Sequence, residues 1–277
     1  RRMNKITLLG TGCPSPSHIR FGPSVLVESN NSKFLFDSGS GVTQRLSQLD
    51  IKPSELDSVF ITHMHSDHIV DLYQVYISGW HTGREETFKV YGPTGITEYF
   101  EGVLNAYNKE LSNRIEWEKR PNEKGLEYKV VEIEDNSEVL QDNVQIKAIE
   151  VDHHPVNPAY GYKIILDNEK SIVISGDTRY SENLISAAEG VDILVHEVFI
   201  ELKLNTTRMS EQTVSNIKDY HTSPEDVGRV ANKAGVKKLV LTHFVPPVFD
   251  EEKLKGRISE YFSGEIIVGK DLMSLEL

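Results

Sequence analysis

The sequence predicts an α/β protein in which two β-sheets pack face to face and helices cover their outer surfaces. A stretch rich in strand patterns is followed by helical patterns, and this order occurs twice along the chain. Metal-binding side chains stand at the ends of short apolar runs, as expected where strands end at one edge of a sheet. The 277 residues contain no Pro/Gly/Ser-rich linker, repeat or low-complexity run, so we expect a single domain over residues 1–277.

The first half begins with short strands separated by turn-forming residues and continues with helical patterns. The strand patterns cover Lys5 to Leu9, Ser24 to Glu28 and Lys33 to Phe36. A Pro-rich loop from Cys13 to Pro23 and the Asn30-Asn31 turn separate these strands. Apolar residues then recur with helical spacing over Val42 to Leu49 and over Gly95 to Leu111.

The second half of the chain again contains strand patterns and helical patterns. Its strand patterns cover Tyr128 to Glu134, Val144 to Val151, Tyr160 to Leu166, Ser171 to Ile174, Ile193 to Val195, Lys238 to Leu241 and Ile266 to Val268. Its helical patterns cover Glu182 to Ala188, Glu211 to Tyr220, Pro224 to Ala234 and Glu251 to Phe262. The pair Ser223-Pro224 indicates a helix start, because Ser caps helix N-termini and Pro is favoured at the first helical position.

Residues 63–68 read His-Met-His-Ser-Asp-His and place four metal-capable side chains within six positions. They follow the apolar run Val59 to Ile61, which is typical of a strand. In an extended chain, side chains two apart point the same way, so His63 and His65 face one position. Asp67 and His68 fall where the chain turns, and they face a second position. The pattern therefore predicts a two-metal site.

Three further candidate ligands come later, each after a short apolar run. His153 follows the run that ends at Val151, Asp177 follows the run that ends at Ile174, and His243 follows Leu239 to Leu241. Imidazole and carboxylate ligands without thiolate suit a catalytic zinc site with open positions. We therefore expect two Zn²⁺ per chain, with manganese or iron as alternatives.

Charge and composition narrow the possible partners. The net charge of −12 and the pI near 5.3 argue against nucleic acid as a partner, because such binding needs clustered Lys and Arg. Cys13 is the one cysteine, so no internal disulfide forms, and we expect it to be a small buried residue. No apolar run is long enough for a membrane helix, and the N-terminus lacks an apolar signal core. We expect a cytoplasmic protein with no membrane partner.

The metal motif and its downstream partners resemble those of the metallo-β-lactamase-fold hydrolase superfamily over nearly the whole chain. The resemblance rests on residues 8–12, 36–39, 63–68, 153, 175–178 and 242–244. The most similar branch contains ribonuclease Z and the zinc arylsulfatases, because residues 194–198 resemble its His-Glu motif and residues 221–223 its His-Thr-Ser loop. The resemblance implies a four-layer αββα sandwich.

The resemblance also implies a role for each site residue. The metal ligands would be His63, His65 and His153 for one ion, Asp67, His68 and His243 for the other, and Asp177 as a bridge. A hydroxide between the ions would attack the ester, and Asp67 would aim it. His221 would assist the leaving group, with Glu197 raising its pKa and fixing its orientation.

Several neighbouring positions leave alternatives open. His153 and His154 are adjacent and cannot both face one metal from a strand, and the family pattern of His, one residue and Pro-Val favours His153. Asp37 either orients a ligand histidine or forms a turn. His196 is expected to pack behind the site. Trp80 suits either the wall of a substrate pocket or the core.

The pair of Glu197 and His221 favours hydrolysis of a phosphodiester or a sulfate ester over β-lactam opening. Bacterial ribonuclease Z enzymes carry a long arm that grips transfer RNA, inserted between the strand at Gly161-Tyr162 and the Gly-Asp motif. Here only a hairpin turn at Asp167-Asn168 fits between these segments. We therefore predict a small-molecule phosphodiester or sulfate ester as the substrate.

Other functions remain open. The alternatives are a tRNA 3′-processing endonuclease of the ribonuclease Z type and a lactone hydrolase. A non-catalytic metal-binding protein is a remote alternative, because no ligand of the motif is replaced. Relatives in this branch tend to form homodimers through the segment after the metal motif, so we expect a homodimer. Residues Tyr73, Val75, Tyr76 and Ile77 suit such a contact, and they equally suit a core helix.

Overall fold

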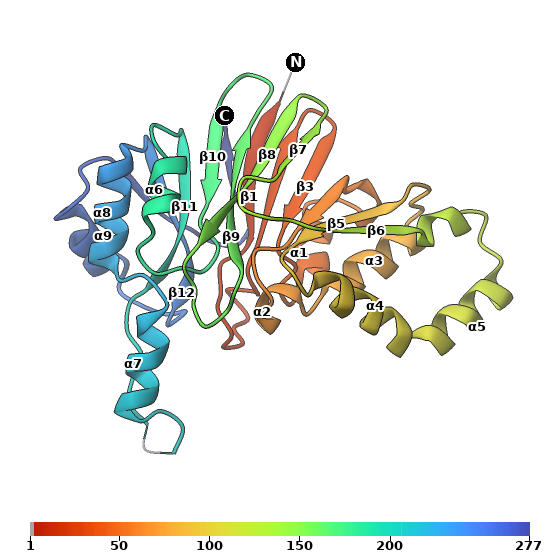
Figure 1. Ribbon diagram of the computed structural model, residues 1–277, viewed down its shortest axis with the longest axis horizontal. Helices are drawn as coiled ribbons and strands as arrows, with labels where there is room; N and C mark the ends of the chain where they lie inside the picture. Colours follow the sequence, from red (N-terminus) through yellow and green to blue (C-terminus); the bar gives the residue numbers. More distant parts are fainter. Residues whose placement is uncertain (1–2, 206) are drawn as a thin grey trace.

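Two seven-stranded β-sheets lie face to face, and helices cover the outer side of each sheet (Figure 1). The computed structural model describes residues 3–205 and 207–277. This is the αββα sandwich that the resemblance implied, and the predicted fold class is therefore confirmed.

The first sheet has an antiparallel part and a parallel part. Its order is β14 (Met273–Glu276), β1 (Asn4–Gly10), β2 (Ser24–Ser29), β3 (Ser32–Phe36), β4 (Ser58–Phe60), β5 (Phe88–Gly92) and β6 (Tyr128–Glu132). Strands β14 to β3 pair antiparallel, and β3 to β6 pair parallel. The helices of this half are α1 (Val42–Gln48), α2 (Ser66–Ile69), α3 (Leu72–His81), α4 (Ile96–Ala106) and α5 (Asn108–Glu118). Leu46, Leu72 and Phe100 of these helices pack on its outer face.

The second sheet mirrors this arrangement. Its order is β13 (Glu265–Val268), β12 (Lys238–Val245), β11 (Ile193–Phe199), β10 (Ser171–Ile174), β9 (Ala159–Ile165), β8 (Val144–Val151) and β7 (Glu138–Gln141). Strands β10 to β13 are parallel, and β7 to β10 are antiparallel. The outer helices are α6 (Glu182–Ala187), α8 (Pro224–Ala234) and α9 (Glu251–Ser259), whereas α7 (Glu211–Asp219) stands away from the sheet (Figure 1). No residue of α7 is buried.

The core between the sheets is apolar and rich in aromatic side chains. Phe36 and Phe60 stack with their ring centroids 5.1 Å apart, and Tyr162 of the opposite sheet packs against both rings. The Tyr162 hydroxyl donates a hydrogen bond of 2.6 Å to the carbonyl of Ile61, which satisfies its one polar group. Burial of these side chains supplies the main force that joins the two sheets.

The parallel strands of both sheets end at a common edge. The segments that follow β4, β8 and β10 carry the histidine motif, His153 and Asp177, and β12 contributes His243. Loops at the carboxyl ends of parallel strands are where α/β folds build their sites. The fold therefore gathers residues from positions 63 to 243 into one place.

Three local predictions need correction. The helix predicted over 95–111 is two helices, α4 and α5, with a turn between them at Tyr107. The Tyr107 ring stacks on that of Tyr73, with centroids 3.9 Å apart. His243 does not follow its strand but lies within β12, which continues to Val245. Strands β5, β7 and β14 were not predicted, since they are short and β7 and β14 lie at the sheet edges with few apolar residues.

The expectations for the turn at Asp167-Asn168 and for Cys13 agree with the structure. Leu166 and Lys170 close a tight turn between β9 and β10 through a backbone hydrogen bond of 2.9 Å, so no arm is inserted there. Val75, Tyr76 and Trp80 of α3 are buried in the core, and Cys13 is buried as well. Within residues 3–205 and 207–277, no helix has the length and apolar character that crossing a membrane requires.

Candidate metal centre and active site

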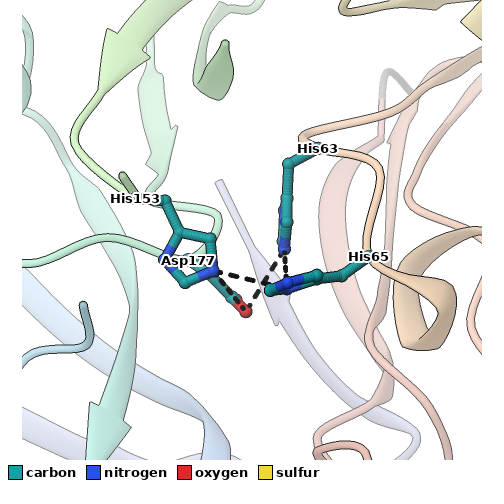
Figure 2. A group of neighbouring side chains, drawn as sticks. All are labelled: His63, His65, His153 and Asp177. Atoms are coloured by element: carbon teal, nitrogen blue, oxygen red, sulfur yellow. Dashed lines mark hydrogen bonds and ion pairs between the residues drawn. The ribbon is translucent and has the colours of Figure 1, made fainter. Parts of the chain in front are cut away.

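The first group of candidate ligands consists of His63, His65, His153 and Asp177, whose ligand atoms all lie within 4.8 Å of one another. His65 Nδ1 lies 3.2 Å from His63 Nε2 and 3.4 Å from His153 Nε2. The Asp177 carboxylate faces the three rings (Figure 2), with Oδ2 3.4 Å from His63 Nε2. Four converging ligand atoms at this spacing match the donor set of a tetrahedral metal site.

The second group shares Asp177 and adds Asp67, His68 and His243, again within 4.8 Å. His68 Nε2 and His243 Nε2 each lie 3.2 Å from Asp177 Oδ2. Asp67 Oδ2 is 3.3 Å from His243 Nε2 and 3.4 Å from His68 Nε2. The structure thus brings together all seven predicted ligands in two groups that share one carboxylate.

Local backbone geometry aims these side chains. Gly176 has φ +60°, and a Cβ there would lie 2.6 Å from the Tyr160 carbonyl oxygen, so glycine is required just before Asp177. His243 also has a positive φ of 53°, at the point where the pairing of β11 with β12 shifts register. Left-handed backbone at a non-glycine residue is costly and is typical of functional sites.

Asp37 orients two ligand histidines. Its carboxylate accepts hydrogen bonds from Thr62 N and Thr62 Oγ1, both at 2.8 Å, and contacts His68 Nδ1 at 2.7 Å. Because a carboxylate only accepts, the protons of His68 Nδ1 and Thr62 Oγ1 point to Asp37. Thr62 Oγ1 must then accept from His63 Nδ1, 2.9 Å away. When neutral, both rings therefore carry their one proton on Nδ1 and present Nε2 to the centre as an acceptor, the tautomer that a metal needs.

Tyr220 performs the same task for His153. His153 Nδ1 donates to the Tyr220 carbonyl at 2.8 Å, and the Tyr220 ring stacks on the His153 ring at 4.2 Å. His154, by contrast, is exposed and contacts Asn157, so His153 is the residue that enters the group. Sequence reasoning missed Tyr220 and Thr62, although the position of Tyr220 next to His221 offered a weak signal.

Burial keeps three histidines of the first group neutral. It lowers the pKa of His65 to about 4 and that of His153 to about 3, and it lowers the pKa of His63 too. The neighbouring His63 lowers the pKa of His65 further. Neutral imidazole is the form that binds a metal ion.

In the second group, the two carboxylates favour the protonated, positively charged form of the histidines. Burial opposes ionisation, but Asp177 and Asp67 outweigh it and raise the pKa of His243 to about 9. They raise the pKa of His68 as well. Burial also opposes ionisation of Asp177, yet the histidines around it hold its pKa well below the ordinary value. A bound divalent cation would supply the positive charge that this group calls for, so the residues fit a metal ion.

A second pair of charged groups lies beside the ligands. His221 Nδ1 is 2.7 Å from Glu197 Oε1, and both side chains are almost fully buried. Burial would lower the pKa of His221, but the Glu197 carboxylate raises it above the ordinary value. The His221 ring lies 5.2 Å from that of His153 and 5.7 Å from that of His243. His196 is buried behind the site, with Nδ1 bonded to the Glu197 carbonyl at 2.7 Å.

Comparison with known proteins agrees with this geometry. The family described as "Anti-Pycsar protein Apyc1" matches residues 4–243. A protein named ribonuclease Z from Mycobacterium bovis is 37% identical over 284 aligned positions, which cover 99% of this chain and 99% of the relative.

Solved structures share the fold over the whole chain. The metallo-β-lactamase-fold protein YhfI from Bacillus subtilis superposes with a TM-score of 0.77 at 22% identity and covers 100% of both chains. The short form of human tRNase Z superposes with a TM-score of 0.71 at 22% identity and covers 98% of both. With its fold, its ligand groups and its relatives in agreement, this chain belongs to the metallo-β-lactamase-fold hydrolases, among the relatives of ribonuclease Z and Apyc1.

Proposed function

We propose that the protein is a phosphodiester hydrolase that works with two divalent metal ions. The observation that carries the proposal is the pair of four-residue groups that share Asp177, with the buried Glu197 and His221 beside them. A centre that only stores metal has no use for a proton donor held next to the ligands. The ribonuclease Z relatives, which are named for cleavage of RNA, support a phosphodiester bond as the target.

The proposed ligand assignment follows the two groups. His63, His65 and His153 would hold one ion and Asp67, His68 and His243 the other, and Asp177 belongs to both groups. Zinc suits these ligands best, and manganese or iron would also accept them. Two such ions, when bound, activate water as a nucleophile at neutral pH and neutralise charge on a phosphoryl group.

The protein's own groups then handle the protons. Asp67 is the least buried carboxylate of the centre and accepts a hydrogen bond from the attacking water, which fixes the direction of attack. His221 donates a proton to the departing oxygen. Glu197 holds the proton on His221, because the carboxylate stabilises the imidazolium at 2.7 Å.

RNA is the first substrate candidate, because the relatives at 37% identity are named ribonuclease Z. Processing of the 3′ end of tRNA is the activity that the resemblance to this branch implies. The missing arm weighs little against it. The chain covers 99% of the Mycobacterium bovis relative, so that protein has no room for a long additional segment either. The prediction that nucleic acid is an unlikely partner is therefore doubtful. The missing arm no longer supports it, and the net charge of −12 is the argument that remains.

A small-molecule phosphodiester is the second candidate. The negative net charge disfavours long-range attraction of a polyanion such as RNA. A cavity of about 520 Å³ beside Asp67 is of the size that takes a small molecule. Sulfate esters and lactones are included in the test below, because the same metal centre would polarise their S–O or C=O bonds.

The test is a side-by-side rate measurement with zinc-loaded and manganese-loaded protein. The substrates are a precursor tRNA transcript, a cyclic nucleotide, bis(p-nitrophenyl) phosphate, p-nitrophenyl sulfate and a lactone. We expect hydrolysis of at least one phosphodiester, abolished in Asp67→Ala and retained in the surface control Asp219→Ala. Turnover of the sulfate or lactone alone, or of none with both metals bound, would overturn the proposal.

A further inference from the structure

The proposed proton donor His221 and its partner Glu197 come from different segments of the chain. Glu197 lies in β11, whereas His221 lies on the loop between α7 and α8. Their side chains meet at 2.7 Å and join segments 24 residues apart. Because a loop is more mobile than a strand, this meeting needs further contacts that hold the loop against the sheet.

Thr222, the next residue on the loop, makes these contacts. Its hydroxyl donates a hydrogen bond to the carbonyl oxygen of Thr178, and its backbone N–H donates to Glu197 Oε2 at 3.4 Å. Its carbonyl oxygen accepts from Phe199 N at 2.8 Å. Thr222 is only 1% exposed, so solvent does not compete for these bonds. The residue thus joins the loop both to β11 and to the segment that follows β10.

Thr178 connects the same contact to the shared carboxylate. It follows Asp177 directly, and its backbone N–H donates at 2.8 Å to Glu197 Oε1, the oxygen that faces His221. Its side-chain oxygen accepts at 3.1 Å from Asp152 N, just after β8. Thr178 is fully buried. One residue therefore fixes the segment of the shared ligand relative to the Glu197 carboxylate and to the His221 loop.

The hydroxyl of Thr222 is the part of this arrangement that a substitution can remove alone. Valine has nearly the shape of threonine but has no donor, so Thr222→Val leaves the buried Thr178 carbonyl without this bond. Serine keeps the hydroxyl. The backbone bonds of Thr222 to Glu197 and Phe199 remain possible in both variants. The loop should therefore stay on the sheet in Thr222→Val while it loses one restraint.

We propose that Thr222 is a positioning residue, which holds His221 in line with the shared carboxylate through its hydrogen bond to Thr178. The proposal rests on the proposed phosphodiesterase function. As the oxygen of water bonds to phosphorus and the leaving oxygen departs, the leaving oxygen takes the proton of His221, which is replaced by the proton that the water loses. A less restrained His221 is aimed at the leaving oxygen for only part of the time.

The experiment compares Thr222→Val and Thr222→Ser on two diesters. Methyl p-nitrophenyl phosphate and methyl phenyl phosphate differ only in the leaving group, and phenolate is the more basic one, so its departure depends more on a proton. Thr7→Val is the matched control, because Thr7 is equally buried and its hydroxyl pairs with Ser274 Oγ at 2.6 Å. Neither Thr7 nor Thr222 belongs to a ligand group. Bound metal and Tm are measured for each variant.

We expect Thr222→Val to lower kcat/KM by about ten-fold or more for the phenyl diester and by about two-fold at most for the p-nitrophenyl diester. Thr222→Ser and Thr7→Val should match the wild type on both substrates. A residue that only supports the fold would slow both reactions equally. No loss, an equal loss on both diesters, a loss that Thr222→Ser shares or a loss of bound metal would overturn the proposal.

Proton NMR of the zinc-loaded protein separates this proposal from the proposed function. The proton between His221 Nδ1 and Glu197 lies between two buried side chains, and His221→Ala identifies its resonance. Thr222→Val should speed up its exchange with solvent, whereas Thr222→Ser and Thr7→Val should not. If no phosphodiester is hydrolysed, the phosphodiesterase function fails. Faster exchange in Thr222→Val alone would then still support the positioning role, and unchanged exchange would exclude it.

Discussion

Changing Asp37 to Asn should weaken metal binding without unfolding the protein. Asp37 accepts from Thr62 N, Thr62 Oγ1 and His68 Nδ1 at 2.7 to 2.8 Å. An Asn amide nitrogen in place of Oδ2 donates where the carboxylate accepted. His68 Nδ1 must then give up its proton, and that proton moves to Nε2, the atom that faces Asp177. Through Thr62, the same reversal reaches His63.

The size of the effect follows from these contacts. Loss of a hydrogen-bond partner behind a ligand histidine typically weakens metal affinity about 10–100-fold, which corresponds to about 1.4 to 2.8 kcal/mol. Because His63 and His68 belong to different groups, both metal equivalents should weaken. The backbone should tolerate the change, since Asn adopts the positive φ of 65° found at this position at least as readily as Asp.

Competition with a chromophoric zinc chelator measures both affinities, and thermal unfolding in chelator checks the fold. Asp57→Asn is the matched control, because Asp57 also accepts a backbone hydrogen bond, from Lys33 N at 2.7 Å, but belongs to neither ligand group. Thr62→Val should weaken mainly the ion held by His63. If Asp37→Asn binds both equivalents as the wild type does, the tautomer argument is wrong.

Three further predictions follow from the structure. His221→Ala should slow hydrolysis of a diester with an alcohol leaving group by about 10²–10⁴-fold but slow p-nitrophenolate release far less, and equal losses in steady-state rates would contradict the role of a proton donor. Chelation should lower the Tm by several degrees, because each ion at about a hundred times its Kd adds about 2.7 kcal/mol, and an unchanged Tm would speak against bound metal. Glu225 bonds Arg257 at 2.6 and 2.8 Å, which lowers the pKa of Glu225. This pair stabilises the fold above the ordinary Glu pKa and stops doing so as the pH falls through the lowered one. Urea unfolding of Glu225→Gln should therefore show a loss of up to about 1 kcal/mol at neutral pH that vanishes in acid, and a loss independent of pH would refute the linkage.

The seven candidate ligands could be proposed from sequence, because the histidine motif and the later candidates follow short apolar runs and because the resemblance to the family favoured His153 over His154. Such a run fixes a strand, and the strand's end fixes the edge of the sheet, so His153 and Asp177 could be placed near the motif without knowing the contacts between them. The apolar run gave the boundaries of β10 without error, and the Ser223-Pro224 pair together with helical spacing gave those of α8. His243 was placed less well, because a strand that continues through a kink leaves no mark in the apolar pattern.

The supporting groups could not be predicted. Thr62 acts through a hydroxyl that many buried threonines share, and Tyr220 acts through its backbone carbonyl, which every residue has. Thr62 meets His63 in this way only because Asp37, with its left-handed backbone, holds the Thr62 hydroxyl. Tyr220 meets His153 only because two segments 67 residues apart in the chain pack together. The break at Tyr107 likewise left no mark in the apolar pattern.

The candidate ligands come from both halves of the chain, and this has a consequence for assembly. His63, His65 and His68 precede residue 70, whereas His153, Asp177 and His243 follow residue 150, and neither half holds a complete group. An ion bound here joins the two sheets at their open edge, so its binding energy is also energy of docking. A chain with only one sheet formed would lack a complete ligand group. The proposed hydrolytic activity would therefore require the complete fold.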